Sequence, residues 1–248
     1  MRKHDKVPAT SGQVGEIAGA FIGEMKLSKS EAKAIVGNMG TFRKDVRKFW
    51  SQYRVDDVEL SSDLIRWTGV YERLFGHKPD LSQIVVPEKP KGFGPMRLVV
   101  VAREIVEWTN GRPLQGTQDA LKKHFPCWQY VDDLDEAIMK NDRDPRSGSY
   151  AVWVRDVQEA DEEFANRSAN DLMAEKHTGI TNLECAIFEA DYYFETGKHL
   201  DVQNVTLCTG SRHRGGYVPL TLWHDRFRVD WAHPSASYSR LHSRRVWA

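Results

Sequence analysis

The 248-residue chain contains little cysteine and no long apolar run. Three cysteines, an odd number, are too few for a disulfide scaffold and favour a reducing compartment. The longest apolar run, residues 98–102, is far shorter than the about 20 residues that span a bilayer. The first residues, MRKHDKVPATSG, lack the apolar core of a signal peptide. We therefore expect a cytoplasmic protein that makes no contact with a membrane.

The chain also has no net charge, because 35 basic residues balance 35 acidic ones. This balance excludes a protein that coats nucleic acid along its whole length. The charge is nevertheless uneven along the chain, with +3 over 1–76, +3 over 77–131, −10 over 132–191, −1 over 192–211 and +5 over 212–248. Any function that depends on charge is expected in the acidic segment or in the arginine-bearing tail.

Helical patterns dominate residues 1–76. Apolar side chains recur at helical spacing over 14–25, 42–53 and 64–75. Ser28 and Glu31 form a capping-box pattern. A serine precedes the apolar pattern of 64–75, and Gly76 follows it as a residue that can end a helix in the left-handed conformation. The sequence predicts an N-terminal helical bundle.

Four prolines and two glycines in 77–95 indicate a linker between two domains. Beyond it the spacing of apolar residues changes from a helical to a strand pattern. Strands are expected at 97–102, 150–154, 205–209, 218–223 and 227–231, with an amphipathic helix at 181–195. The strands do not alternate strictly with helices, so a doubly wound sheet is not favoured. The predicted class is α+β, with a helical bundle (1–76), a linker (77–95) and a mixed-sheet α+β domain of about five strands (96–248).

Acidic residues cluster at the start of the acidic segment, at Asp132, Asp133, Asp135, Asp142 and Asp144. A hard cation would need several of these carboxylates at one point, but the spacing is not that of an EF-hand and suits helix caps and turns equally well. No metal site and no cofactor are predicted.

A second group of reactive side chains follows the 181–195 helix. His199 and Asp201 are two residues apart, and Cys208 and His213 lie further along, but no close Cys/His pair typical of zinc is present. The alternative function is a divalent-metal-dependent hydrolase or a nuclease-like enzyme. Its weak catalytic candidates are Asp133, Asp144, His199, Asp201 and Cys208.

The stretch TGSRHRGG, residues 209–216, lies between two predicted strands. Glycines allow backbone N–H groups to turn towards a ligand, and arginines supply paired donors. We therefore expect an anion or a phosphate near Arg212, His213 and Arg214. The competing interpretation is a long hairpin loop with solvated arginines.

Basic residues lie opposite the aromatic face of the 42–53 helix, at Arg43, Lys44, Arg47 and Lys48. With the preceding helix and the turn at 37–40 they resemble a helix-turn-helix, which would contact nucleic acid. Any small bundle has a polar outer face, so another protein is the alternative partner. Trp223 and Trp231 are interpreted either as half-buried packing or as a stacking platform for a sugar or a base.

The stretch from Met96 onward resembles an uncharacterised family of bacterial hypothetical proteins, known from metagenome-derived genomes of small-genome bacteria. The matching pieces include RLVVVA (97–102), NDRDPRSGSYAVWVRD (141–156), GITNLE (179–184), ETGKHLD (195–201) and TLCTGSRHRGGYVP (206–219). The family would have an apolar residue at Asn182, a departure that we expect at the surface. The resemblance implies a C-terminal module after a variable N-terminal region, and no activity. The expected function is a binding or interaction module that contacts nucleic acid or an anionic ligand.

Overall fold

The computed structural model describes residues 28–38, 42 and 61–248. The chain divides into two units, Met1–Val58 and Glu59–Ala248. In the first unit, α2 (Lys29–Gly37) begins at Ser28, whose side chain accepts from the Glu31 N–H while Glu31 accepts from the Ser28 N–H. The predicted capping box is therefore confirmed. The expected helix at 14–25 and nearly all of the one at 42–53 lie outside the described residues.

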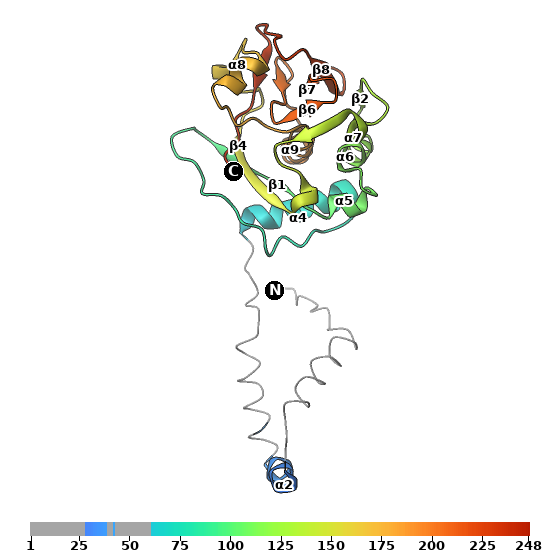
Figure 1. The fold of residues 1–248 in the computed structure, drawn as a ribbon, viewed down its shortest axis with the longest axis vertical. Helices are drawn as coiled ribbons and strands as arrows, with labels where there is room; N and C mark the ends of the chain where they lie inside the picture. The colour runs from blue at the N-terminus through green and yellow to red at the C-terminus, as the bar shows by residue number, and fades with distance from the viewer. Residues whose placement is uncertain (1–27, 39–41, 43–60) are drawn as a thin grey trace. The chain divides into compact units, whose positions relative to one another are not determined.

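The second unit contains helices and mixed sheets and is of the α+β class (Figure 1). Its helices are α4 (Ser62–Phe75), α5 (Ile105–Trp108), α6 (Pro113–Leu121), α7 (Leu134–Ala137), α8 (Ala169–Ala174) and α9 (Asn182–Thr196), with short 3₁₀ turns at Pro145–Ser147 and Glu162–Phe164. Its strands are β1 (Met96–Val101), β2 (Cys127–Gln129), β3 (Ile138–Asn141), β4 (Tyr150–Arg155), β5 (Val205–Leu207), β6 (Ser211–His213), β7 (Val218–Trp223), β8 (Phe227–Ala232) and β9 (Leu241–Ser243).

Three sheets are formed from these strands. The largest has five strands in the order β2-β8-β7-β5-β9 and is mixed, since β2 runs parallel to β8 and β5 runs parallel to β9. The pairs β1-β4 and β3-β6 are separate antiparallel ladders. A mixed five-stranded sheet was expected, but with β1 and β4, the strands with the strongest apolar patterns, inside it.

Helix α9 is the centre of the second unit. It packs against β1, α4, α6 and β7, and Figure 1 shows it between the β1-β4 pair and the larger sheet. Its first ten residues, 182–191, are all buried, as in a helix enclosed on every side. Thr181 and Glu184 form a capping box at its start, and Gly197 ends it at a φ of 70°. Asn182, which we expected at the surface, is only 1% exposed because this first turn lies in the interior.

Helix α4 belongs to this second unit and not to an N-terminal bundle, which corrects the expected boundary at 76/77. Its stripe Trp67, Tyr71 and Leu74 is buried in the same core as β1. Trp67 Nε1 donates to the Leu98 carbonyl at 2.8 Å and Tyr71 Oη donates to the Val100 carbonyl at 2.9 Å. The predicted linker therefore does not separate two domains, since α4 before it and β1 after it share one core. One of its residues, Leu81, is itself buried.

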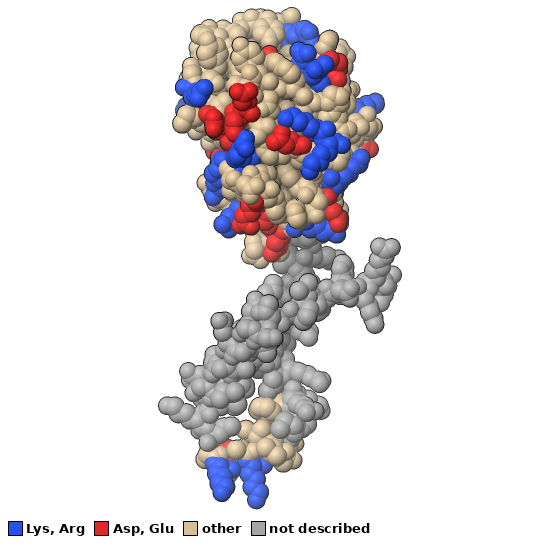
Figure 2. All heavy atoms as spheres, turned by 90° about the vertical axis from the view of Figure 1, so that its right-hand side faces the viewer, with Lys and Arg blue, Asp and Glu red and all other residues tan. Residues whose placement is uncertain are grey.

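No helix among the residues described, 28–38 and 61–248, is long and apolar enough to cross a membrane. On the face of the second unit drawn in Figure 2, basic and acidic side chains lie beside one another rather than in separate large areas.

Candidate functional site

The arginine-bearing segment 209–216 is more ordered than a simple hairpin loop. Residues 211–213 form β6, which pairs with β3 so that Asn141 faces Ser211 and Lys140 faces Arg212. Successive side chains of a strand point to opposite faces. The predicted anion-binding trio is divided between two pockets. Arg212 lines one, whereas His213, on the opposite face of β6, and Arg214, which follows the strand, line another.

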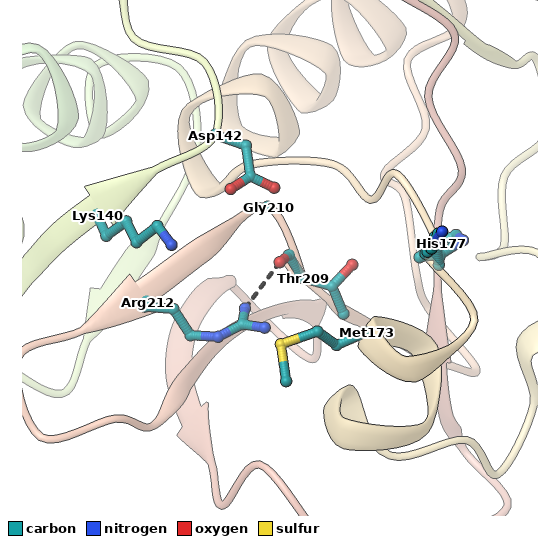
Figure 3. Close-up of a pocket in the computed structure, with 8 residues that line it drawn as sticks. Lys140, Asp142, Met173, His177, Thr209, Gly210 and Arg212 are labelled. Atoms are coloured by element: carbon teal, nitrogen blue, oxygen red, sulfur yellow. Dashed lines mark hydrogen bonds between the residues drawn. The ribbon is translucent and has the colours of Figure 1, made fainter.

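We call the first of these the cationic pocket. It has a volume of about 300 Å³ and lies between the β3-β6 ladder and α8 (Figure 3). Its lining residues are Lys140, Asp142, Met173, Lys176, His177, Thr209, Gly210 and Arg212. Three of these side chains are cations and one is a carboxylate.

Arg212 is the half-buried cation of this pocket. Its Nη1 donates to the carbonyls of Thr209 and Ser211, each at 2.7 Å, which fixes the plane of the guanidinium. Burial lowers the pKa of the Arg212 guanidinium, and nearby Asp142 opposes this. An arginine nevertheless stays protonated at neutral pH. Within residues 61–248, no carboxylate lies within the 4.0 Å ion-pair distance of Arg212, Lys140 or Lys176.

One end of the pocket is a chain of hydroxyl groups beside a histidine. Ser243 Oγ lies 3.3 Å from Thr209 Oγ1 and 3.2 Å from His177 Nε2, and it donates to the Leu207 carbonyl at 3.1 Å. Burial, and then the positive charge of Arg245, lower the pKa of His177 to about 4. The imidazole is therefore neutral at neutral pH and adds no charge to the pocket.

Two glycines allow the backbone segments behind the pocket to approach one another. A Cβ on Gly179 would lie 1.6 Å from Thr209 Oγ1, and a Cβ on Gly210 would lie 2.7 Å from the Gly179 carbonyl oxygen. Both distances are shorter than any real carbon contact, so a side chain at either position would displace Thr209 or the 179–180 backbone. Gly210 N also donates to the Ile180 carbonyl at 3.0 Å, which holds the two segments together.

The clustered aspartates act mainly as helix caps and ion-pair partners. Asp133 caps α7 and pairs with Arg112. Asp144 caps the 145–147 turn and pairs with Arg146 at 3.0 Å. Capping and pairing account for both carboxylates without a cation.

The other enzyme candidates lie in the core beside α9. His199 is held by Glu189, whose Oε1 lies 2.5 Å from His199 Nδ1, and its ring stacks on Trp223 at 3.2 Å between centroids. Asp201 is 3% exposed and paired with Arg244. Cys208 is fully buried, with its Sγ 3.4 Å from that of Cys185.

These side chains do not meet at an accessible cleft. The space bordered by Glu189, Asp201 and Arg244 is too small to admit a water molecule. Asp133 and Asp144 lie near α7 with arginine partners of their own. In the part of the chain that the structure describes, no three His, Cys, Asp or Glu side chains are grouped so as to hold a metal ion. The geometry therefore gives the hydrolase alternative no support.

The predicted nucleic-acid residues, Arg43, Lys44, Arg47 and Lys48, lie outside the described residues. Of the two tryptophans singled out, Trp223 packs on His199 and Phe125, as in the packing interpretation. Trp231 instead lines the pocket that also contains His213 and Arg214.

Of the residues predicted to hold an anion, Arg212 lines the cationic pocket, and Asp142 of the acidic cluster lies there too. Lys140, Lys176 and His177 come from segments that no local motif connects to 209–216. Only the pairing of β3 with β6 brings Lys140 beside Arg212.

No family model, no curated protein and no solved structure matches this chain. The resemblance to a family of bacterial hypothetical proteins accordingly stays a prediction.

Proposed function

We propose that the second unit binds a small anionic ligand, one that carries a phosphate or carboxylate group, in the cationic pocket. The observation that carries this proposal is the unpaired positive charge. Lys140, Lys176 and Arg212 face one pocket with only Asp142 as a counter-charge, which leaves a formal charge of about +2.

The placement of Arg212 supports an anion in particular. Its Nη1 is engaged by two carbonyls, whereas Nε and Nη2 donate to no protein group that the structure describes. These two nitrogens present the paired donors that match a phosphate or carboxylate edge. Because the guanidinium is half-buried, its attraction for an anion is screened less than that of a surface lysine.

The remaining lining groups suit the same ligand. Lys140 and Lys176 are exposed and can move to meet an anion, while the Thr209 hydroxyl adds a neutral donor. A volume of about 300 Å³ is at the lower end of the range for ligand pockets, which favours a small molecule over a polymer.

Calorimetric titration of the full chain with inorganic phosphate, pyrophosphate and citrate tests this proposal. We expect at least one to bind, with an affinity that falls as sodium chloride rises. Arg212→Gln should weaken binding by about 10- to 100-fold, because a charge-assisted hydrogen bond contributes about 1.5–3 kcal/mol. Lys198→Gln is the matched control, since this lysine is exposed and does not line the pocket. Absence of binding at low salt for all three anions would refute the proposal.

A further inference from the structure

The second pocket beside β6 differs from the cationic pocket in both size and chemistry. We call it the aromatic pocket. It has a volume of about 620 Å³ and is lined by Tyr130, Val131, His213, Arg214, Tyr217, Asp230 and Trp231. This pocket and the cationic pocket share no lining residue, although Arg212 and His213 of β6 line one each.

The aromatic pocket lies where β2 ends beside β8. The last parallel bond of this ladder runs from Tyr130 N to the Val229 carbonyl, at 3.1 Å. One step further, Trp231 pairs with Pro219 of β7, and its N–H donates to the Asp230 carboxylate at 2.8 Å. The pocket lies at this end of β2, with Asp230 and Trp231 in its lining.

Two of its aromatic side chains are exposed to solvent. Tyr130 is 68% exposed and Tyr217 is 45% exposed. Tyr217 is held by edge contacts with His213 and His233, at 6.2 Å and 5.8 Å between ring centroids. Trp231 is half-buried and in turn packs on His213 at 4.7 Å. The pocket therefore offers supported ring surfaces to a ligand.

Its polar groups carry opposite charges that do not neutralise each other directly. Arg214 and Asp230 both line the pocket, and neither has an ion-pair partner within 4.0 Å among residues 61–248. His213 adds no charge, because burial lowers its pKa and its Nδ1 accepts from the Gly215 N–H at 3.0 Å. A ligand with a net charge would be attracted by one of these two side chains and repelled by the other.

From this combination we infer that the aromatic pocket binds a neutral carbohydrate. A sugar ring has an apolar C–H face that packs on tyrosine and tryptophan rings. Its hydroxyl groups both donate to a carboxylate such as Asp230 and accept from a guanidinium such as Arg214. A pocket of about 620 Å³ accommodates more than one sugar ring, so the ligand is a short oligosaccharide. This site does not depend on the anion proposed for the cationic pocket.

The test is titration of the full chain with neutral trisaccharides of glucose (maltotriose and cellotriose), of xylose and of N-acetylglucosamine. Calorimetry and tryptophan fluorescence follow binding. We expect at least one trisaccharide to bind with a Kd below about 10 mM. The affinity should be the same at about 50 and about 500 mM sodium chloride, because a neutral ligand has no charge to be screened.

Substitutions of the exposed tyrosines test whether the trisaccharide binds in the aromatic pocket. Tyr217→Ala and Tyr130→Ala should each weaken binding at least about tenfold, because each removes a ring surface. Tyr217→Phe keeps the ring and should bind nearly as the unaltered protein does. Tyr238→Ala is the matched control, since Tyr238 is 43% exposed and does not line the pocket. These tyrosines are exposed, so the variants are expected to fold.

Three outcomes would overturn the inference. The first is that no trisaccharide binds at about 10 mM, and the second is that a trisaccharide still binds when Tyr130→Ala and Tyr217→Ala are combined. The third is that adenosine or phenylalanine amide binds and the trisaccharides do not. The Arg212→Gln variant should bind the trisaccharide normally, which separates this site from the cationic pocket.

Discussion

Arg244 and Asp201 form a buried ion pair beside the central helix, with Nη2 of the arginine 2.7 Å from Oδ1 of the aspartate. Neither residue is more than 3% exposed. The other guanidinium nitrogens donate to the Val157 carbonyl and the Thr206 hydroxyl, and Thr206 in turn donates to Asp201 Oδ2 at 2.6 Å. Every charge of this cluster is therefore hydrogen-bonded, as buried charges require.

Removing one partner of this pair should strongly destabilise the protein. Arg244→Met leaves the Asp201 carboxylate buried without its cation, and we expect the free energy of unfolding to fall by about 3–5 kcal/mol. Urea denaturation measures the loss. Arg226→Met is the control, because Arg226 pairs with Asp225 at the surface and should leave the free energy of unfolding nearly unchanged. Equal stability of the two variants would contradict the expected result.

His177 should make the protein less stable in mild acid. Its pKa is lowered to about 4 in the folded state, against about 6.5 when unfolded. Between these values the unfolded chain binds more protons, so stability falls as pH decreases through this window and recovers as pH rises. The His177→Gln variant should lose less stability than the unaltered protein between pH 7 and about pH 5, as measured by urea midpoints. Equal losses of stability in the two proteins would contradict this prediction.

Asn182 carries a buried polar group with no partner. Its backbone N–H donates to Ser211 Oγ at 3.0 Å, but its side-chain Nδ2 is buried and makes no hydrogen bond. Asn182→Leu keeps the shape and the backbone bond while removing the unsatisfied amide, so we expect the free energy of unfolding to rise by about 1 kcal/mol. Asn170→Leu, at an exposed position near the start of α8, should give no comparable gain. A destabilised Asn182→Leu protein would show that this amide has a partner in solution.

Asp142 should limit the affinity of the cationic pocket for anions. It is the single carboxylate in the pocket lining and lies near Arg212. Asp142→Asn removes this negative charge, and we expect phosphate or the best-binding anion to bind about three- to tenfold more tightly at low salt. The gain should shrink as salt screens the site. Unchanged affinity at low salt would place the bound anion elsewhere.

Local signals in the sequence were sufficient for the helix ends and for most strands. The capping box at Ser28 and the glycine at 76 act within a few residues, so the sequence shows them directly. The short strands β3, β6 and β9 were not predicted, because their segments contain too few apolar residues for an alternating pattern. Hydrogen bonds to strands that are distant in the sequence stabilise these segments, and no local sequence pattern indicates such pairing.

The candidate sites differ in the same way, because local motifs are visible in the sequence and contacts between distant segments are not. The glycines and arginines of 209–216 predict an anion site, and Arg212 lines the cationic pocket in which we propose one. A local motif does not show that residues 211–213 form a strand, so it does not separate His213 from Arg212 or place Arg214 in the second pocket. The catalytic candidates were chosen by residue type alone. Packing around α9 gave His199 and Asp201 partners of their own, Glu189 and Arg244, and left no accessible space beside them.

The contact of α4 with β1 determines how far the chain can be shortened from its N-terminus while the second unit stays intact. Trp67 and Tyr71 engage carbonyls along the free side of β1, and Tyr71 Oη also accepts from the Ala102 N–H at 3.0 Å. A shortened protein that starts at the prolines, after residue 76, would expose this row of backbone groups as a template for pairing with another chain. Such a fragment should self-associate, whereas one that starts at Glu59 retains the helix and should remain monodisperse in size-exclusion chromatography.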